Sequence, residues 1–128
     1  MAKSQWDSGW RSSSVRVQIL QPGLPGQPQR EWIELSAYQH SRIPGLAVHE
    51  APGDLYWVIT HVPSGLAVVR YIPNRTHAQR AAVELHLAAH AHCGMGWDIP
   101  GEELAAAPCM QWRADLTCLR YPQRAPRG

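Results

Sequence analysis

The first hydrophobic pattern along the chain is in residues 14–20 (SVRVQIL), where aliphatic and polar residues alternate. Alternation with a period of two predicts a strand with one buried face. Residues 21–29 contain three prolines and two glycines, which predicts a loop. Residues 31–38 (EWIELSAY) then form a second predicted strand, so the two runs make a long-looped hairpin. Residues 45–50 (GLAVHE) are either a short third strand or an extended segment.

Residues 54–73 (DLYWVITHVPSGLAVVRYIP) contain two β-rich runs on either side of the tripeptide PSG. Pro63 suits the second position of a type I turn, and Gly65 suits the left-handed residue that follows it. The pattern therefore predicts a hairpin with a three-residue loop. In this register the opposed pairs are Val62 with Leu66, Thr60 with Val68, Ile59 with Val69, and Trp57 with Tyr71.

This register sorts the side chains of the hairpin onto two faces. We expect the core face to carry Leu55, Trp57, Ile59, Val69 and Tyr71. The second hairpin face, our candidate binding surface, carries Tyr56, Val58, Thr60, Val68, Arg70 and Ile72. Tyrosine and arginine dominate interface energetics, while aliphatic neighbours exclude water. The alternative is that the N-terminal strands or residues 109–121 cover this face and make it a second core layer.

A helix is predicted over residues 76–93, because Thr76 and Gln79 match a capping box, alanines fill the interior, and Gly94 is a stop signal. On a helical wheel, small and apolar residues fall within one arc that should pack on the sheet. This arc contains Ala78, Ala81, Ala82, Leu85, Ala88, Ala89 and His92. A second apolar strip, formed by Val83, Leu87 and His90, lies away from that arc and offers a homodimer or partner contact.

The predicted fold class is α+β, with a mostly antiparallel sheet of four or five strands and the helix 76–93 packed on one face. Residues 14–118 form a single domain, and residues 1–13 and 119–128 are expected to be tails. Residues 98–108 predict one or two helical turns, with Glu102 and Glu103 near their start.

Three residues on the helix could bind a metal ion, because His86, His90 and Cys93 follow i, i+4 and i+7 spacing. Cys109 or Cys118 would have to complete a tetrahedral site. The sequence between the histidines is HLAAH and lacks the glutamate of a metalloprotease motif. The alternative, which we favour, is an ordinary polar flank of a helix, so no metal and no cofactor is expected.

The sequence contains no recognised catalytic motif: it has no G-x-S-x-G elbow, no phosphate-binding P-loop and no dinucleotide fingerprint. The net charge of +2 is too small to predict nucleic-acid binding, although eleven of the twelve basic residues are arginine. All ten aromatic residues are Trp or Tyr, whose polar atoms suit wet core edges and interfaces.

The three cysteines, Cys93, Cys109 and Cys118, are an odd number with no CxxC pair, and the first 14 residues lack the apolar region of a signal peptide. We therefore expect reduced thiols and a cytoplasmic location. No apolar run approaches the length needed to span a bilayer, so we expect no membrane contact.

The order of strand, THVPSG, strand, helix and tryptophan over residues 57–97 resembles small proteins of phages and other mobile elements. No diagnostic family motif is present, and no site follows from the resemblance. We expect a non-enzymatic binding protein, an accessory or inhibitory module that docks on a macromolecular partner, more readily a protein than a nucleic acid. The alternatives are a single-stranded nucleic-acid-binding protein that uses Trp/Tyr stacking with arginine and a metal-binding protein.

Overall fold

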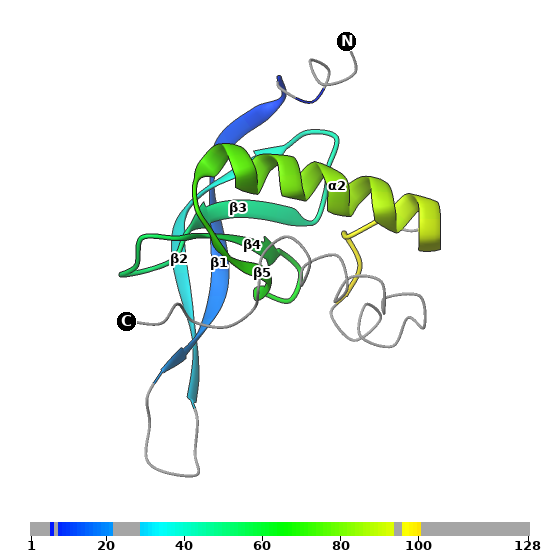
Figure 1. Ribbon diagram of the computed structural model, residues 1–128. Helices are drawn as coiled ribbons and strands as arrows, with labels where there is room; N and C mark the ends of the chain where they lie inside the picture. Colours follow the sequence, from blue (N-terminus) through cyan, green and yellow to red (C-terminus); the bar gives the residue numbers. More distant parts are fainter. Residues whose placement is uncertain (1–5, 7, 22–28, 94–95, 101–128) are drawn as a thin grey trace.

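A computed structural model describes residues 6, 8–21, 29–93 and 96–100 of the chain. The elements are β1 (Trp10–Gln21), β2 (Gln29–His40), β3 (Leu46–Glu50), β4 (Trp57–His61), β5 (Leu66–Ile72) and α2 (Arg75–Cys93). All strand pairings are antiparallel, and the order in the sheet is β1-β2-β3-β4-β5 (Figure 1). The predicted α+β fold with one main helix on a sheet is confirmed.

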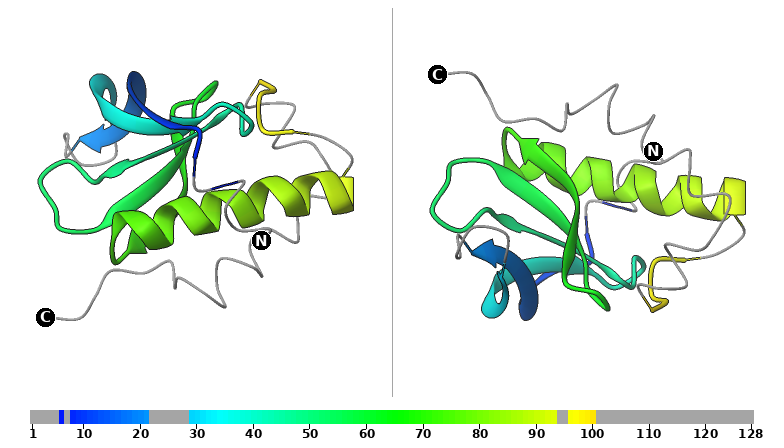
Figure 2. Two further views of the ribbon diagram at one scale, coloured as in Figure 1. Left: turned by 90° about the horizontal axis from the view of Figure 1, so that it is seen from above. Right: turned by 90° about the horizontal axis from the view of Figure 1, so that it is seen from below.

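The elements form three layers, with β3–β5 in the middle (Figure 2). Helix α2 covers one face of β3–β5, and the long β1–β2 hairpin crosses the opposite face, which we call the back face. β2 joins β3 where Tyr38 pairs with Val48. On the far side of the hairpin, the Gln18 amide donates a hydrogen bond of 2.7 Å to the carbonyl of Gly65, in the turn between β4 and β5. The β1–β2 hairpin is therefore tied to the sheet at both edges.

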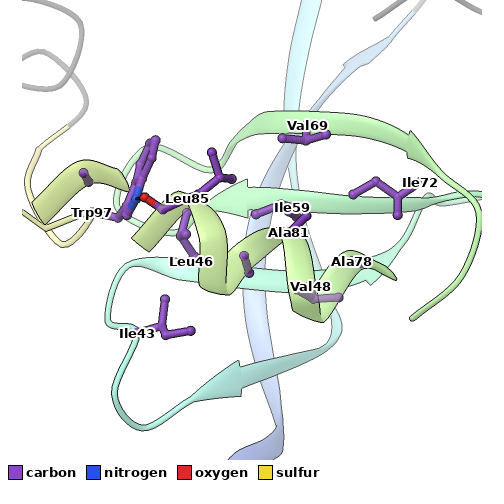
Figure 3. Close-up of a cluster of buried hydrophobic side chains, with 12 residues drawn as sticks. Ile43, Leu46, Val48, Ile59, Val69, Ile72, Ala78, Ala81, Leu85 and Trp97 are labelled. Carbon is purple, nitrogen blue, oxygen red and sulfur yellow. Dashed lines mark hydrogen bonds between the residues drawn. The ribbon is translucent and has the colours of Figure 1, made fainter. Parts of the chain in front are cut away.

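The main core lies between α2 and the sheet (Figure 3). Small alanine side chains let the helix approach the strands closely, and Trp97 fills the end of this layer. The predicted packing arc is confirmed by the burial of Ala78, Ala81, Ala82, Leu85 and Ala89. Ala88 is half-buried, and the side chain of His92 lies outside the described part of the chain.

The helix begins one residue earlier than predicted, and a different residue caps it. The side-chain oxygen of Asn74 accepts a hydrogen bond of 2.9 Å from the His77 amide, and the Asn74 carbonyl accepts one of 3.1 Å from the Ala78 amide. This is the geometry of an N-cap residue. The predicted capping box on Thr76 and Gln79 was therefore wrong, because asparagine at position 74 satisfies the free amides first.

The register of the β4–β5 hairpin differs from simple alternation. Ile59 pairs with Val69 as predicted, but the other pairs are Trp57 with Ile72, Thr60 with Ala67, and His61 with Leu66. The register shifts twice along β4, and Tyr71 takes a left-handed φ of 63°. Each extra residue in β5 reverses which side chains face the helix.

These shifts correct the predicted face for part of β5. Ile72 is fully buried in the helix-side core, and Val68 packs against that core. The loop holds four residues instead of three, because His61 and Leu66 already pair and the Gly65 amide bonds to the His61 carbonyl. The left-handed conformation of Gly65, with φ of 73°, is as predicted.

β1 begins at Trp10, so residues 10–13 belong to the sheet and not to the predicted N-terminal tail. Trp6 and Trp10 are partly buried and pack against the helix-side core. Most of the predicted turns at 98–108, the segment 109–121 and the tail 119–128 lie outside the described residues. Within the described chain, α2 lacks the apolar length needed to cross a membrane.

Candidate functional site

The candidate site is a hollow on the back face of the sheet. The pairing of β3 with β4 places His49 beside Val58 and Ala47 beside Thr60 on this face. The β1–β2 hairpin covers part of it through an apolar layer that includes Val17 and Ala47. The uncovered part is a depression of about 290 Å³ between β1 and the sheet. Its lining, which defines the back-face hollow, includes Val17, His49, Tyr56, Val58, Thr60 and Arg70.

The hollow contains a buried polar pair. His49 Nδ1 lies 2.8 Å from the Glu50 carbonyl oxygen, and His49 Nε2 lies 2.7 Å from the Thr60 hydroxyl. Because a carbonyl can only accept, Nδ1 carries the proton, and Nε2 accepts the hydrogen of Thr60. Burial lowers the pKa of His49, although the Glu50 carbonyl acts in the opposite direction. The ring is therefore neutral at physiological pH, and both of its nitrogens are occupied.

The rim of the hollow carries the groups that face solvent. Tyr56 is half-buried, and its ring centroid lies 4.7 Å from that of Tyr71. Burial raises the pKa of Tyr56, Tyr71 and Asp54 raise it further, and Arg70 lowers it. Its hydroxyl group is therefore a neutral hydrogen-bond donor at physiological pH. Arg70 is exposed, so the rim offers a cation and a phenol side by side.

The predicted binding residues do not all meet at this site. Four members of the second hairpin face line the hollow: Tyr56, Val58, Thr60 and Arg70. The other two, Val68 and Ile72, belong to the helix side because of the shifted register. Sequence reasoning missed His49 and the β1 residues near Gln18. The alternation in LAVHE could have placed His49 on the face opposite Val48, whereas no local signal predicts that β1 crosses here.

The predicted metal-binding residues are brought together only in part. The rings of His86 and His90 lie 4.6 Å apart, while the side chain of Cys93 lies outside the described residues. Over the described ranges, no group of three or more candidate ligands is close enough to hold a metal ion. His86 is only 9% exposed, so it is not the solvent-facing flank residue that the helical wheel indicated. Metal binding by this helix stays the alternative to the prediction of no metal, and the described residues do not test it.

The second apolar strip is divided between core and solvent. Val83 is half-buried against the helix-side core, whereas Leu87 and His90 are exposed. Together with Trp6 and Trp10, Val83 lines a groove of about 770 Å³ along the side of α2. The three residues of the strip therefore do not form one continuous exposed apolar surface.

His86 lies in a cluster of potential cations near the N-terminal segment. Its ring centroid is 5.8 Å from Trp6, and Trp6 also contacts His40 and the guanidinium of Arg42. Burial lowers the pKa of His86, and His90, His40 and Arg42 lower it further, while Asp98 raises it. Protonation of His86 is therefore unfavourable in the folded protein.

We expect the free energy of unfolding to fall below neutral pH. The folded pKa values of His49 and His86 lie below their usual 6.5, so the unfolded chain binds more protons once the pH drops through 6.5. The contribution of the two histidines to the free energy of unfolding is then fully present above about pH 7. It decreases toward pH 5, by at most about 1.4 kcal/mol per pH unit for each histidine. Urea unfolding of the wild type, His49→Gln and His86→Gln at several pH values measures this. If the free energy of unfolding depends on pH equally in the wild type and in both variants, the pH dependence does not come from His49 and His86.

We compared the chain with protein family models, with curated proteins and with solved structures. None of the three comparisons found a match. The function is therefore inferred from this chain's own residues.

Proposed function

We propose that the protein is a non-enzymatic binding protein, an accessory or inhibitory module, that docks on a protein partner through the back-face hollow. The observation that carries the proposal is the combination of a depression of about 290 Å³ with Tyr56 and Arg70 at its rim. Tyrosine and arginine are the residues most often found at the energetic centre of protein interfaces. Apolar neighbours such as Val58 supply the contact area that excludes water.

The chemistry of the hollow supports binding over catalysis. A general base needs a free lone pair and a pKa close to the working pH. His49, the histidine that lines the hollow, uses one nitrogen toward Glu50 and the other toward Thr60. The Tyr56 hydroxyl is held in its neutral form because burial raises its pKa. His49 is therefore suited to holding the shape of the hollow, and Tyr56 is suited to donating a hydrogen bond to a partner.

The size and charge of the hollow favour one or two side chains of a partner. A volume of about 290 Å³ is at the lower limit of pockets that enclose small ligands. Arginine forms paired hydrogen bonds with carboxylates, so exposed Arg70 suits an acidic side chain beside the one that enters the hollow. We infer an anchoring residue of a protein partner with a carboxylate near it.

The test is a paired capture experiment in the native host. Tyr56→Ala combined with Arg70→Ala removes the rim, whereas Arg80→Ala combined with Leu87→Ala alters a similar amount of exposed surface on α2. We expect the rim variant to lose the captured partner, the α2 variant to keep it, and both to melt within a few degrees of the wild type. Loss of several kcal/mol of stability by the rim variant would instead show that Tyr56 and Arg70 belong to the buried layer that β1 and β2 form over the rest of this face.

A second candidate function is binding of single-stranded nucleic acid. Trp32 on β2 is 44% exposed, and the guanidinium of Arg16 lies 5.2 Å from the centre of its ring. An exposed indole with an adjacent arginine is the type of platform on which bases stack. Nuclease treatment of the captured material separates the two candidates, because a protein partner remains bound and a nucleic acid is lost.

A further inference from the structure

Among the described residues, no strand pairs with the outer edge of β1 before its contact with the β4–β5 turn. The register with β2 runs without interruption from Trp10 to Gln21. In an antiparallel pair, successive residues direct their amide and carbonyl groups alternately toward the partner strand and away from it. The Gln18 amide points away from β2, because it bonds to the Gly65 carbonyl. The backbone groups of Arg16, Ser14 and Ser12 therefore point outward as well.

These outward groups have no hydrogen-bond partner among the described residues. The side chains of Ser12, Ser14 and Arg16 are exposed, so solvent or another chain can reach this edge. An unpaired row of backbone donors and acceptors is a template for an added strand. The Gly65 carbonyl closes the edge at Gln18, which limits the template to the segment before it.

The charges along this edge favour an acidic occupant. Arg11 and Arg16 are both exposed on β1. The carboxylate nearest to them in the register is Glu34, which pairs with Arg16 across the hairpin and accepts a hydrogen bond of 2.8 Å from the Ser14 hydroxyl. A second copy of the chain would bring two further arginines onto the same edge, and like charges in neighbouring strands are destabilising. An acidic segment would instead be attracted to Arg16 on one face of β1 and to Arg11 on the other.

We propose that an extended, acidic segment of the protein partner adds to β1 as a sixth strand, pairing with Ser12, Ser14 and Arg16. The inference rests on the proposed function, because it describes how the bound chain lies beside the back-face hollow. One carboxylate of the segment sits next to Arg16. The segment ends before Gln18, where Gly65 occupies the edge and packs against the ring of Trp32.

Proline at position 14 tests the added strand selectively. Because the Ser14 amide points away from β2, Ser14→Pro removes an outward donor without removing a hydrogen bond of the β1–β2 ladder, and proline is tolerated at such edge positions. Ser14→Ala is the matched control. Both variants lose the hydroxyl contact with Glu34, but only alanine keeps the amide.

The probes are two acetylated and amidated nine-residue peptides, one alternating glutamate with valine and one with lysine in place of each glutamate. We expect the acidic peptide to bind the full-length protein and the basic peptide to bind at least about tenfold more weakly. Ser14→Pro should weaken acidic-peptide binding about tenfold or more, as loss of a hydrogen bond together with a steric clash requires. Ser14→Ala should stay close to the wild type. Amide exchange measured by NMR should slow at Ser12, Ser14 and Arg16 and stay unchanged at Val15.

Three results would overturn the inference: no binding of the acidic peptide, equal affinity of Ser14→Pro and Ser14→Ala, or slowed exchange confined to other strands. None of them affects the proposed function, which is judged by the capture of the partner with the Tyr56→Ala and Arg70→Ala variant. If that variant keeps its partner while Ser14→Pro loses it, the added strand stands and the hollow is not the anchor.

Discussion

Replacing Trp97 by alanine should lower the free energy of unfolding by about 3–5 kcal/mol, the usual cost of removing a buried tryptophan. The indole is fully buried in the helix-side core, and its Nε1 donates a hydrogen bond of 3.1 Å to the Leu85 carbonyl (Figure 3). It also contacts the ring of His61. Trp97 therefore fixes the chain after α2 against both the helix and the sheet, and alanine would leave a large cavity there.

Urea unfolding monitored by circular dichroism measures this loss. Trp97→Phe is the informative companion, because it keeps an aromatic ring but removes the indole N–H. We expect the Leu85 carbonyl to lose the indole N–H and keep its helical hydrogen bond, while the smaller ring leaves a gap. The loss of unfolding free energy should therefore lie between zero and that of Trp97→Ala. A loss below about 1 kcal/mol for Trp97→Ala would show that this tryptophan is not part of the core.

Gly45→Ala should lower the free energy of unfolding by about 3 kcal/mol or more, nearly as much as Trp97→Ala, for two independent reasons. Gly45 has a φ of +95°, a conformation that costs an L-residue roughly 1–2 kcal/mol. A Cβ atom at this position would also overlap the backbone of Trp97 and the Asp98 amide. Backbone atoms cannot rotate away as a flexible side chain does. The strand entry would have to shift, and the hydrogen bond of 2.8 Å from the Val62 amide to the Gly45 carbonyl would weaken.

Gly53→Ala is the matched control for this prediction. Gly53 has a similar positive φ of +75°, but a Cβ atom there would meet nothing within 4 Å. Gly53→Ala therefore reports the cost of the backbone conformation alone, about 1–2 kcal/mol. Thermal unfolding of the two variants side by side gives the contribution of the overlap. Equal losses for Gly45→Ala and Gly53→Ala would contradict the close approach of residue 45 to Trp97.

Local patterns in the sequence predict much of this fold. The alanine-rich spacing predicts α2 and its buried side, and Gly65 predicts a left-handed residue in the β4–β5 turn. Both features can be predicted because each depends only on residues close together in the sequence, either on one helical repeat of apolar positions or on one glycine in a turn. The details of β5 were not predicted, because the bulges at Tyr71 and between Ile59 and Thr60 interrupt the period of two. A bulge changes which side chains face the core, and these shifts accompany the burial of Ile72 against the helix.

The candidate site was only partly predictable for a related reason. Tyr56 and Arg70 could be assigned from alternation around the turn, and both lie at the hollow. The hollow itself exists because the β1–β2 hairpin crosses the back face and leaves part of it uncovered. That crossing is a long-range feature held by contacts such as Gln18 with Gly65, residues that are far apart in the sequence.

In the proposed function, the rim of the back-face hollow binds a protein partner. Its most direct test is calorimetric titration of the captured, purified partner into the wild type and into the Tyr56→Ala and Arg70→Ala variant. We predict that the variant binds weaker by about 2 kcal/mol or more, roughly thirtyfold in Kd, with an unchanged melting temperature. Equal Kd values for the two proteins would contradict the claim and place the binding surface elsewhere on the molecule.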